Sequence, residues 1–239
     1  MRALFIADAH LRHPEDANYR ALLAFLDAQA GRLDLLALLG DIFEFWAGDR
    51  GVIHPSYRPL LTSLERLSNS GTRLIYVEGN HDFDLGRQFS EKLGCLVLPD
   101  GGTIELDGLN LYLAHGDLAN TEDRGYRLLR RLLRTRFLRT LIRHLPIDWV
   151  MAIALRSSRR SRNQHSQSKK RWPAHEILLP YASQILTSGC HAVLTGHFHQ
   201  PFHQQLEHGD LYALGDWITQ YSYLLYENGR FELGNYSAF

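Results

Sequence analysis

Side chains that can bind metal ions occur in five short blocks along this chain of 239 residues, and an apolar run precedes each block. The runs are short and are bounded by glycine or polar residues, which is typical of buried β-strands. In open α/β sheets, residues just beyond the carboxyl ends of the strands converge on one rim, where sites are built. The runs cover residues 3–7, 35–39, 74–77, 109–114 and 192–194, and the side chains that follow them are Asp8, His10, Asp41, Asn80, His115, His197 and His199.

The types of ligand indicate hydrolysis with two metal ions. Carboxylate, imidazole and amide oxygen groups suit manganese, iron, zinc or magnesium, whereas Cys95 and Cys190, the only cysteines, fall in none of the blocks. A carboxylate can bridge two ions roughly 3.5–4 Å apart, and such a pair activates a water and neutralises charge on a displaced phosphoryl oxygen. We expect Asp41 to be that bridge. Each block taken singly could be a turn, because Asn and Gly tolerate left-handed backbone, but five blocks in one order predict a phosphoesterase site.

Length and composition predict a single enzyme domain over residues 1–239, with residues 120–172 as an insert. A chain with 45% hydrophobic residues can bury a large core without dividing into two domains. No apolar stretch approaches the roughly 20 residues of a spanning helix, and the chain begins with a strand, so we expect neither a transmembrane segment nor a signal peptide. Two unpaired cysteines are typical of a reducing cytoplasm.

The formal net charge of zero conceals a strong asymmetry. Between Arg124 and Arg171 there are 15 Lys or Arg residues and one acid, Asp148, which leaves 11 basic and 25 acidic residues in the remainder. A basic insert on an acidic body indicates a polyanionic or membrane-surface partner.

The insert begins with leucines on a helical period, which predicts one helix from Leu128 to Leu145 that Pro146 ends. A second apolar helix is predicted over residues 147–155. The arginines between the leucines, among them Arg130, Arg134 and Arg139, are expected to contact an anionic surface. Such helices either lie at a lipid interface as a cap over the site or form a solvated hairpin whose leucines pack on the core. The polar residues 157–171 predict a loop, which is either a phosphate-gripping lid or an exposed connector.

With its order Asp-x-His, Gly-Asp, Gly-Asn-His and Gly-His-x-His, the stretch from Leu4 to His199 resembles the calcineurin-like metallophosphoesterases. The resemblance implies an α/β (α+β) fold, a four-layer αββα sandwich, here with a helical cap insertion. It also implies that His81 sits beside the scissile phosphate as an acid or a transition-state stabiliser, a structural hydrogen bond being the alternative. Two divalent ions are implied, with Mn²⁺ as the metal favoured by the family. The first ion would take Asp8, His10, Asp41 and His199, and the second Asp41, Asn80, His115 and His197.

Within this superfamily the chain is most similar to the UDP-2,3-diacylglucosamine hydrolases, the pyrophosphatases of the lipid A pathway. The similarity rests on residues 41–49, 80–86, 115–126 and 214–217, which read DIFEFWAGD, NHDFDLG, HGDLANTEDRGY and LGDW. It implies cleavage of the substrate's diphosphate to give UMP and 2,3-diacylglucosamine 1-phosphate. It further implies a lipid-linked nucleotide as partner and a cytoplasmic enzyme associated peripherally with the inner membrane through its basic amphipathic cap, whose leucines would line an acyl-chain groove.

The same resemblance implies roles for individual side chains. Asp41, Asn80 and His81 are the implied catalytic residues. Ser161 and Lys169 match the polar contacts of the lid loosely, because their spacing shifts by about a residue. The implied substrate-binding residues are Asn80, His81, Asp123, Ser161, Lys169 and His197.

Two departures from that group leave a second substrate class open. Position 81 is His where the group usually carries Arg, and residues 197–201 read HFHQP where Thr and Arg are more usual at the second and fourth places. An Arg clamps a diphosphate in bidentate fashion, which His cannot do. The alternative is therefore hydrolysis of another diphosphate or phosphodiester, as by a nuclease or a nucleotide hydrolase. Rows of leucine disfavour a nucleic-acid partner, and the complete set of seven ligands disfavours an inactive scaffold. The oligomeric state stays open.

Overall fold

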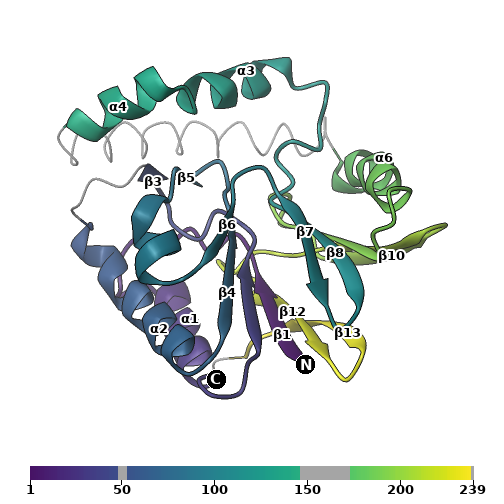
Figure 1. Ribbon diagram of the computed structural model, residues 1–239, viewed down its shortest axis with the longest axis horizontal. Helices are drawn as coiled ribbons and strands as arrows, with labels where there is room; N and C mark the ends of the chain where they lie inside the picture. The colour runs from purple at the N-terminus through teal and green to yellow at the C-terminus, as the bar shows by residue number, and fades with distance from the viewer. Residues whose placement is uncertain (48–52, 146–172, 238–239) are drawn as a thin grey trace.

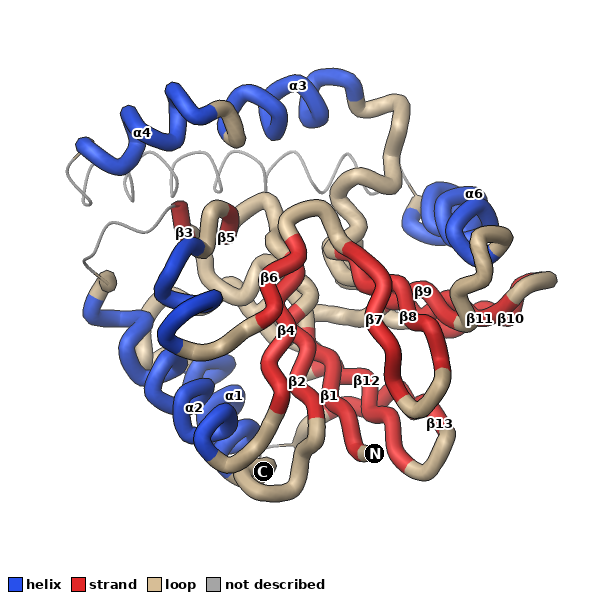
Figure 2. Tube along the Cα trace, viewed as in Figure 1, coloured by secondary structure: helices blue, strands red, loops and turns tan. Residues whose placement is uncertain are grey.

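The computed structural model describes residues 1–47, 53–145 and 173–237. Two β-sheets pack face to face, with helices on their outer sides (Figures 1 and 2). The first sheet has six strands in the order β13-β12-β1-β2-β4-β6. Its strands are β1 (Arg2–Ile6), β2 (Leu35–Leu38), β4 (Arg73–Val77), β6 (Leu96–Leu98), β12 (Ser222–Glu227) and β13 (Arg230–Asn235).

The second sheet has five strands in the order β10-β11-β9-β8-β7, and β3 pairs with β5 in a separate two-stranded ladder. Strands β1, β2, β4 and β6 run parallel to one another in the first sheet, as do β8, β9 and β11 in the second. The carboxyl ends of the predicted strands therefore share one edge in each sheet. The bounds are β3 (Trp46–Ala47), β5 (Asp82–Phe83), β7 (Gly102–Leu106), β8 (Leu109–Ala114), β9 (Ala192–Thr195), β10 (Phe202–Leu206) and β11 (Gly209–Ala213).

Alternating side chains along the strands build two of the buried layers. Phe5 of β1 faces the second sheet in a cluster with Leu194 of β9, whereas Leu4 faces the helices α1 (Ala17–Asp27) and α2 (Arg58–Asn69). Both faces of the sheet are thus apolar, which is why its strands read as continuous hydrophobic runs.

A third cluster covers the outer face of the second sheet. There Val193 and Leu211 pack against α6 (Ala174–Leu186), so helix, sheet, sheet and helix form the predicted αββα sandwich. The predicted fold class is therefore confirmed. The remaining short elements are a 3₁₀ helix, η1 (Pro55–Tyr57), and a π-helix, η2 (Gln88–Lys92).

The insert begins with two helices, α3 (Arg124–Leu133) and α4 (Arg136–His144), which lie across the strand ends at the top of Figure 1. The prediction of one helix from Leu128 to Leu145 was wrong. Thr135 has an extended backbone, with ψ of 144°, and its side chain accepts a hydrogen bond from Leu138 N, so it caps α4 and interrupts the helical run. The predicted helix at 147–155 and the polar loop at 157–171 lie outside the described residues.

The two faces of α3 and α4 differ in their surroundings. The side chains of Leu128, Leu129, Leu132 and Phe137 are 50–79% exposed, so in the described residues these apolar groups do not pack on the core. Arg130 and Arg134 instead face the body. The expectation that these two arginines contact an anionic surface was therefore wrong, because their guanidinium groups already pair with buried carboxylates of the body.

Arg130 Nε lies 2.8 Å from Asp117 Oδ2, and Arg134 Nη2 lies 3.1 Å from Glu78 Oε2. Both arginines also contact Asp100. Asp117 and Glu78 each stand two residues from a predicted metal ligand, so these pairs join the cap to the edge of the site. None of the helices among the described residues has the length and apolarity needed to cross a bilayer.

Candidate metal centre

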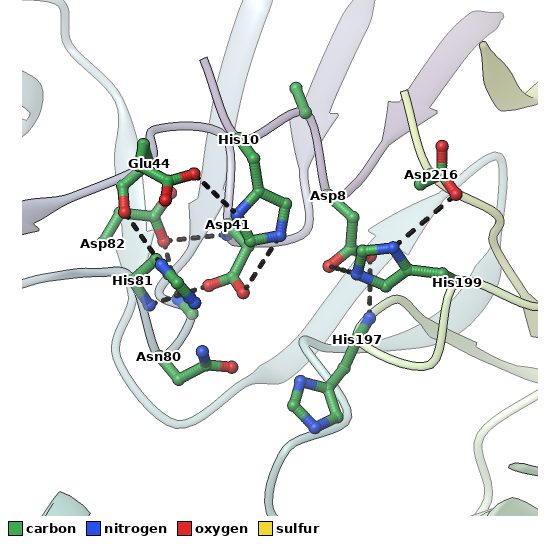
Figure 3. A network of polar contacts seen from close by, with 12 residues as sticks. Asp8, His10, Asp41, Glu44, Asn80, His81, Asp82, His197, His199 and Asp216 are labelled. Atoms are coloured by element: carbon green, nitrogen blue, oxygen red, sulfur yellow. Dashed lines mark hydrogen bonds and ion pairs between the residues drawn. The ribbon is translucent and has the colours of Figure 1, made fainter. Parts of the chain in front are cut away.

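The loops that follow β1, β2, β4, β8 and β9 bring all seven predicted ligands to one rim of the sandwich. Figure 3 shows six of them, Asp8, His10, Asp41, Asn80, His197 and His199. Asp41 is central, because its Oδ2 lies 3.5 Å from His115 Nε2 and 3.7 Å from His10 Nε2. Beside it, His199 Nε2 lies 3.3 Å from Asp8 Oδ1. Residues far apart in sequence therefore meet as the strand-end pattern predicted.

Two groups of donors match the two predicted ligand sets. Asp8, His10 and His199 form one group, and Asp41, His115 and His197 form the other, with the ligand atoms of each group within 4.8 Å of one another. Asn80 Oδ1 lies 3.1 Å from His115 Nε2 and joins the second group. A further group contains His10, Asp41 and His81, which places His81 beside the predicted bridge.

The residues present fit a pair of divalent ions. Asp8 and Asp41 are almost completely buried, and Asp8 Oδ1 has no hydrogen-bond partner among the described residues. Buried carboxylates need a cationic partner, and oxygen and imidazole donors without thiolate suit divalent ions such as manganese or magnesium.

Glycines next to the ligands permit the close approach of the loops. A Cβ on Gly79 would lie 2.2 Å from Asp41 Oδ1, and a Cβ on Gly196 would lie 2.7 Å from Asp8 Oδ2. Asp8, Asp41 and His199 have left-handed backbone with φ near 55°, a conformation that costs energy in residues other than glycine. The fold therefore holds strained residues at the point where the ligands converge.

Asp82 holds two of the ligand loops together, a role that was missed from the sequence. Its buried carboxylate accepts hydrogen bonds from the main-chain N–H groups of Asp41 (2.9 Å), Ile42 (2.6 Å) and Gly79 (2.9 Å) and from Tyr76 Oη (2.6 Å). The only sequence signal was its place at the end of the Gly-Asn-His-Asp block.

Three of the imidazole rings have an oxygen near Nδ1 that orients the ring. His115 Nδ1 lies 2.8 Å from Leu39 O, and His81 Nδ1 lies 2.8 Å from Glu44 O. Since a carbonyl oxygen only accepts, each Nδ1 carries the proton and donates it. His10 Nδ1 lies 3.8 Å from Glu44 Oε2. In each ring Nε2 is left for the centre, as is usual for histidines that bind metal.

Burial and neighbouring charges set the pKa values of the centre. Burial lowers the pKa of His10 to about 4 and that of His197 to about 4, so both rings are neutral near pH 7. Burial also opposes the charge on His199, but the carboxylates of Asp8 and Asp216 outweigh it and raise its pKa to about 10. Burial disfavours ionised Asp41 too, yet the nearby imidazoles, His115 first, hold its pKa well below the usual range.

The other predicted substrate contacts fall elsewhere. Asp123 lies in the cap, where its Oδ1 accepts a hydrogen bond from Tyr126 N at 2.9 Å and begins α3. The Tyr126 hydroxyl in turn donates to Asp117. His81 meets His10 edge-on, with ring centroids 4.7 Å apart. Ser161 and Lys169 lie outside the described residues.

Comparison with known proteins identifies the family and the fold. The model of the calcineurin-like phosphoesterase family matches residues 1–201, and the chain belongs to that family. Its fold is similar to that of an archaeal phosphodiesterase, with a TM-score of 0.51 and 11% identity over 98% of each chain.

Relatives that match over almost the full length of the chain are more informative than the family match alone. The chain is 35% identical, over 98% of its length and 95% of the relative's, to a UDP-2,3-diacylglucosamine hydrolase of Pseudomonas syringae pv. tomato. The corresponding enzymes of Aeromonas salmonicida (34% identity, 96% and 91% covered) and Pseudomonas paraeruginosa (36%, 92% and 92%) are similar. The predicted resemblance is confirmed both for the calcineurin-like family and for the UDP-2,3-diacylglucosamine hydrolases. The chain is a metal-dependent hydrolase.

Proposed function

We propose that this chain hydrolyses the diphosphate of UDP-2,3-diacylglucosamine and releases UMP and 2,3-diacylglucosamine 1-phosphate. The observation that carries the proposal is the position of a cluster of carboxylate and imidazole groups beneath a cap with exposed leucines. A phosphate-cleaving centre next to an apolar surface suits a substrate that is half nucleotide and half lipid. Relatives that match over almost the full length of the chain are named for this activity, which supports the same substrate.

The proposed ligand sets follow the two donor groups. Asp8, His10, Asp41 and His199 hold the first ion, and Asp41, Asn80, His115 and His197 hold the second. When bound, such a pair of ions activates a water and neutralises charge on the phosphoryl group. We take Mn²⁺ as the native metal, because the resemblance to the calcineurin-like metallophosphoesterases favours it and the oxygen and imidazole donors without thiolate are compatible with it.

His81 assists at the phosphoryl oxygens in this proposal. Its Nδ1–H is committed to the carbonyl of Glu44, so Nε2 is the nitrogen left for the substrate. In the protonated ring that nitrogen donates one hydrogen bond to a phosphoryl oxygen, which stabilises developing negative charge. Asn80 contacts a substrate phosphate through its amide, and His197 does so beside the second ion.

Contacts to the rest of the substrate are assigned to the cap. One oxygen of Asp123 begins α3, and we assign the other to the glucosamine nucleotide. Ser161 and Lys169 are assigned to the lid's polar contacts from the resemblance alone.

One observation favours a second candidate, which is hydrolysis of another diphosphate or phosphodiester. His81 offers a single donor where an Arg would offer a bidentate pair. Activity of the manganese-loaded protein on UDP-2,3-diacylglucosamine, bis-p-nitrophenyl phosphate and single-stranded DNA separates the candidates. Higher kcat/KM for UMP release than for nitrophenol or nucleotide release supports the lipid substrate, and the opposite order supports the second candidate.

We further propose that the cap associates with the cytoplasmic face of the inner membrane. Leu129 is 54% exposed on α3 among arginines, a composition that suits an anionic lipid surface. Leu129→Ser should weaken sedimentation with anionic vesicles by about 10-fold, since burying such a side chain contributes about 1.5–3 kcal/mol. Leu96→Ser is the matched control, because Leu96 is 42% exposed on β6 of the body. Equal sedimentation of both variants would reject membrane association through the cap.

A further inference from the structure

The loop between β11 and β12 contacts His199 at both its ring and its main chain. We propose that Asp216, in this loop, is a positioning residue that fixes the tautomer and orientation of His199 for the first metal ion. The inference rests on the proposed ligand set and adds a residue to it. The match to the calcineurin-like phosphoesterase family ends at residue 201, so Asp216 lies beyond the matched residues.

The two nitrogens of the His199 ring face two different carboxylates (Figure 3). Nδ1 lies 3.6 Å from Asp216 Oδ2, and Nε2 lies 3.3 Å from Asp8 Oδ1. An ionised carboxylate only accepts hydrogen bonds, so Asp216 favours the tautomer with the proton on Nδ1. The lone pair of Nε2 is then directed toward Asp8, as a metal ligand requires.

The same loop also fixes the main chain of both ligands. Gln220 Nε2 donates to His199 O at 2.9 Å and to Asp216 Oδ2 at 3.1 Å. Trp217 N donates to Asp8 O at 3.1 Å. His199 and Asp8 both have left-handed backbone, and these contacts restrain that conformation. The loop therefore connects two predicted ligands of one ion.

Asp216 is held rigidly enough to act in this way. Its side chain is 8% exposed, and its Oδ1 accepts hydrogen bonds from the N–H groups of Ile218 (2.9 Å), Thr219 (2.7 Å) and Gln220 (3.2 Å). These donors occupy Oδ1, so Oδ2 is the oxygen that faces the imidazole.

This arrangement makes Asp216→Asn a selective variant. The three N–H groups keep the remaining oxygen of the amide, and its NH₂ group, which replaces the oxygen that accepts from Gln220 Nε2, must then face His199 Nδ1. Because NH₂ donates, Nδ1 becomes the acceptor and the ring proton moves to Nε2. The nitrogen toward Asp8 then lacks a lone pair for the metal, although the side chain keeps its size.

The chain offers a matched control in a second Asp–His pair. Asp210 Oδ1 lies 2.7 Å from His203 Nε2, and both residues belong to the β10–β11 hairpin outside the site. Asp210→Asn therefore removes the same kind of contact without touching a predicted ligand.

Mn²⁺ titration followed by electron paramagnetic resonance tests the inference. We expect Asp216→Asn to bind one of two ions about 10- to 100-fold more weakly, the usual effect of losing such an outer partner. The spectrum of a spin-coupled manganese pair should give way to that of an isolated ion, while the Tm of the metal-free protein stays near that of the wild type. Asp210→Asn should bind both ions normally. Normal binding of both ions by Asp216→Asn would overturn the inference.

A second measurement needs no variant at position 216. In zinc-loaded wild-type protein labelled with ¹⁵N-histidine, nuclear magnetic resonance should report His199 with its proton on Nδ1, with the signal assigned through His199→Gln. An Nε2–H tautomer would overturn the inference even if Asp216→Asn failed to fold. Neither readout uses a nucleotide or a lipid, so failure of the proposed substrate would be seen separately.

Discussion

The carboxylate of Asp82 accepts a hydrogen bond from the main-chain N–H of Asp41 at 2.9 Å, so one buried acid fixes the backbone of the predicted bridging ligand. Asp82 also accepts from Gly79 N, on the loop that carries Asn80. Asp82 thereby fixes the positions of the two loops relative to each other before any ion binds. This explains how donors from separate strands can converge in the folded chain itself.

Asp82→Ala should destabilise the protein by about 3 kcal/mol. The change leaves several buried N–H groups without an acceptor, and each such loss costs about 1–3 kcal/mol. Urea denaturation of the metal-free protein measures the effect, with Asp210→Ala as control, since Asp210 pairs with His203 on the β10–β11 hairpin outside the site. Equal midpoints for both variants would show that Asp82 does not hold the loops.

Asp41→Ala should reduce turnover by at least about 1,000-fold, because several kcal/mol of charge stabilisation depend on a correctly held metal pair. Metal analysis of the same sample should show that fewer ions are retained. A variant that keeps both its metal content and its activity would rule out Asp41 as the bridge.

Metal binding at the first site should strengthen as the pH rises from about 6.5 to about 10. The Asp8 and Asp216 carboxylates raise the pKa of His199 to about 10 in the metal-free protein, so below that pH the ring holds a proton that a metal must displace. Calorimetric titration with Mn²⁺ in buffers of different ionisation enthalpy should detect release of about one proton. Affinity independent of pH, with no proton release, would contradict this assignment.

Arg130→Gln should loosen the cap from the body. Arg130 pairs with Asp117, whose side chain is 3% exposed, and with the more exposed Asp100. Breaking a buried pair leaves an uncompensated carboxylate and costs about 3 kcal/mol or more.

Amide hydrogen exchange in α3 measures the opening of the cap directly. Arg131→Gln is the control, because Arg131 is exposed on the same helix. If exchange in α3 were equally slow in both variants, the pair with Asp117 would not anchor the cap.

The strands and the ligand cluster could be predicted because each ligand follows a buried apolar run, and parallel strands bring such ends to one rim. Asp8 and His199 are far apart in sequence, yet this rule alone places them together. The sandwich was implied by the resemblance to the calcineurin-like metallophosphoesterases, and strands that are buried on both faces agree with it.

Other features depend on contacts that periodicity does not encode. Leucine spacing predicts the apolar face of the cap, but it does not reveal that Arg130 and Arg134 meet acids of the body. The break at Thr135 arises from a side-chain cap within an otherwise helical pattern. The position of Asp216 next to His199 depends on how the chain returns from the second sheet to the first, which the sequence of the loop does not specify.

The most direct measurement is the release of UMP from UDP-2,3-diacylglucosamine by protein that has been stripped of metal and reloaded with Mn²⁺. We expect UMP and 2,3-diacylglucosamine 1-phosphate in equal amounts, no product from the stripped protein, and recovery on reloading. Absence of UMP from reloaded protein that still hydrolyses bis-p-nitrophenyl phosphate would contradict the proposed substrate while leaving the metal centre intact.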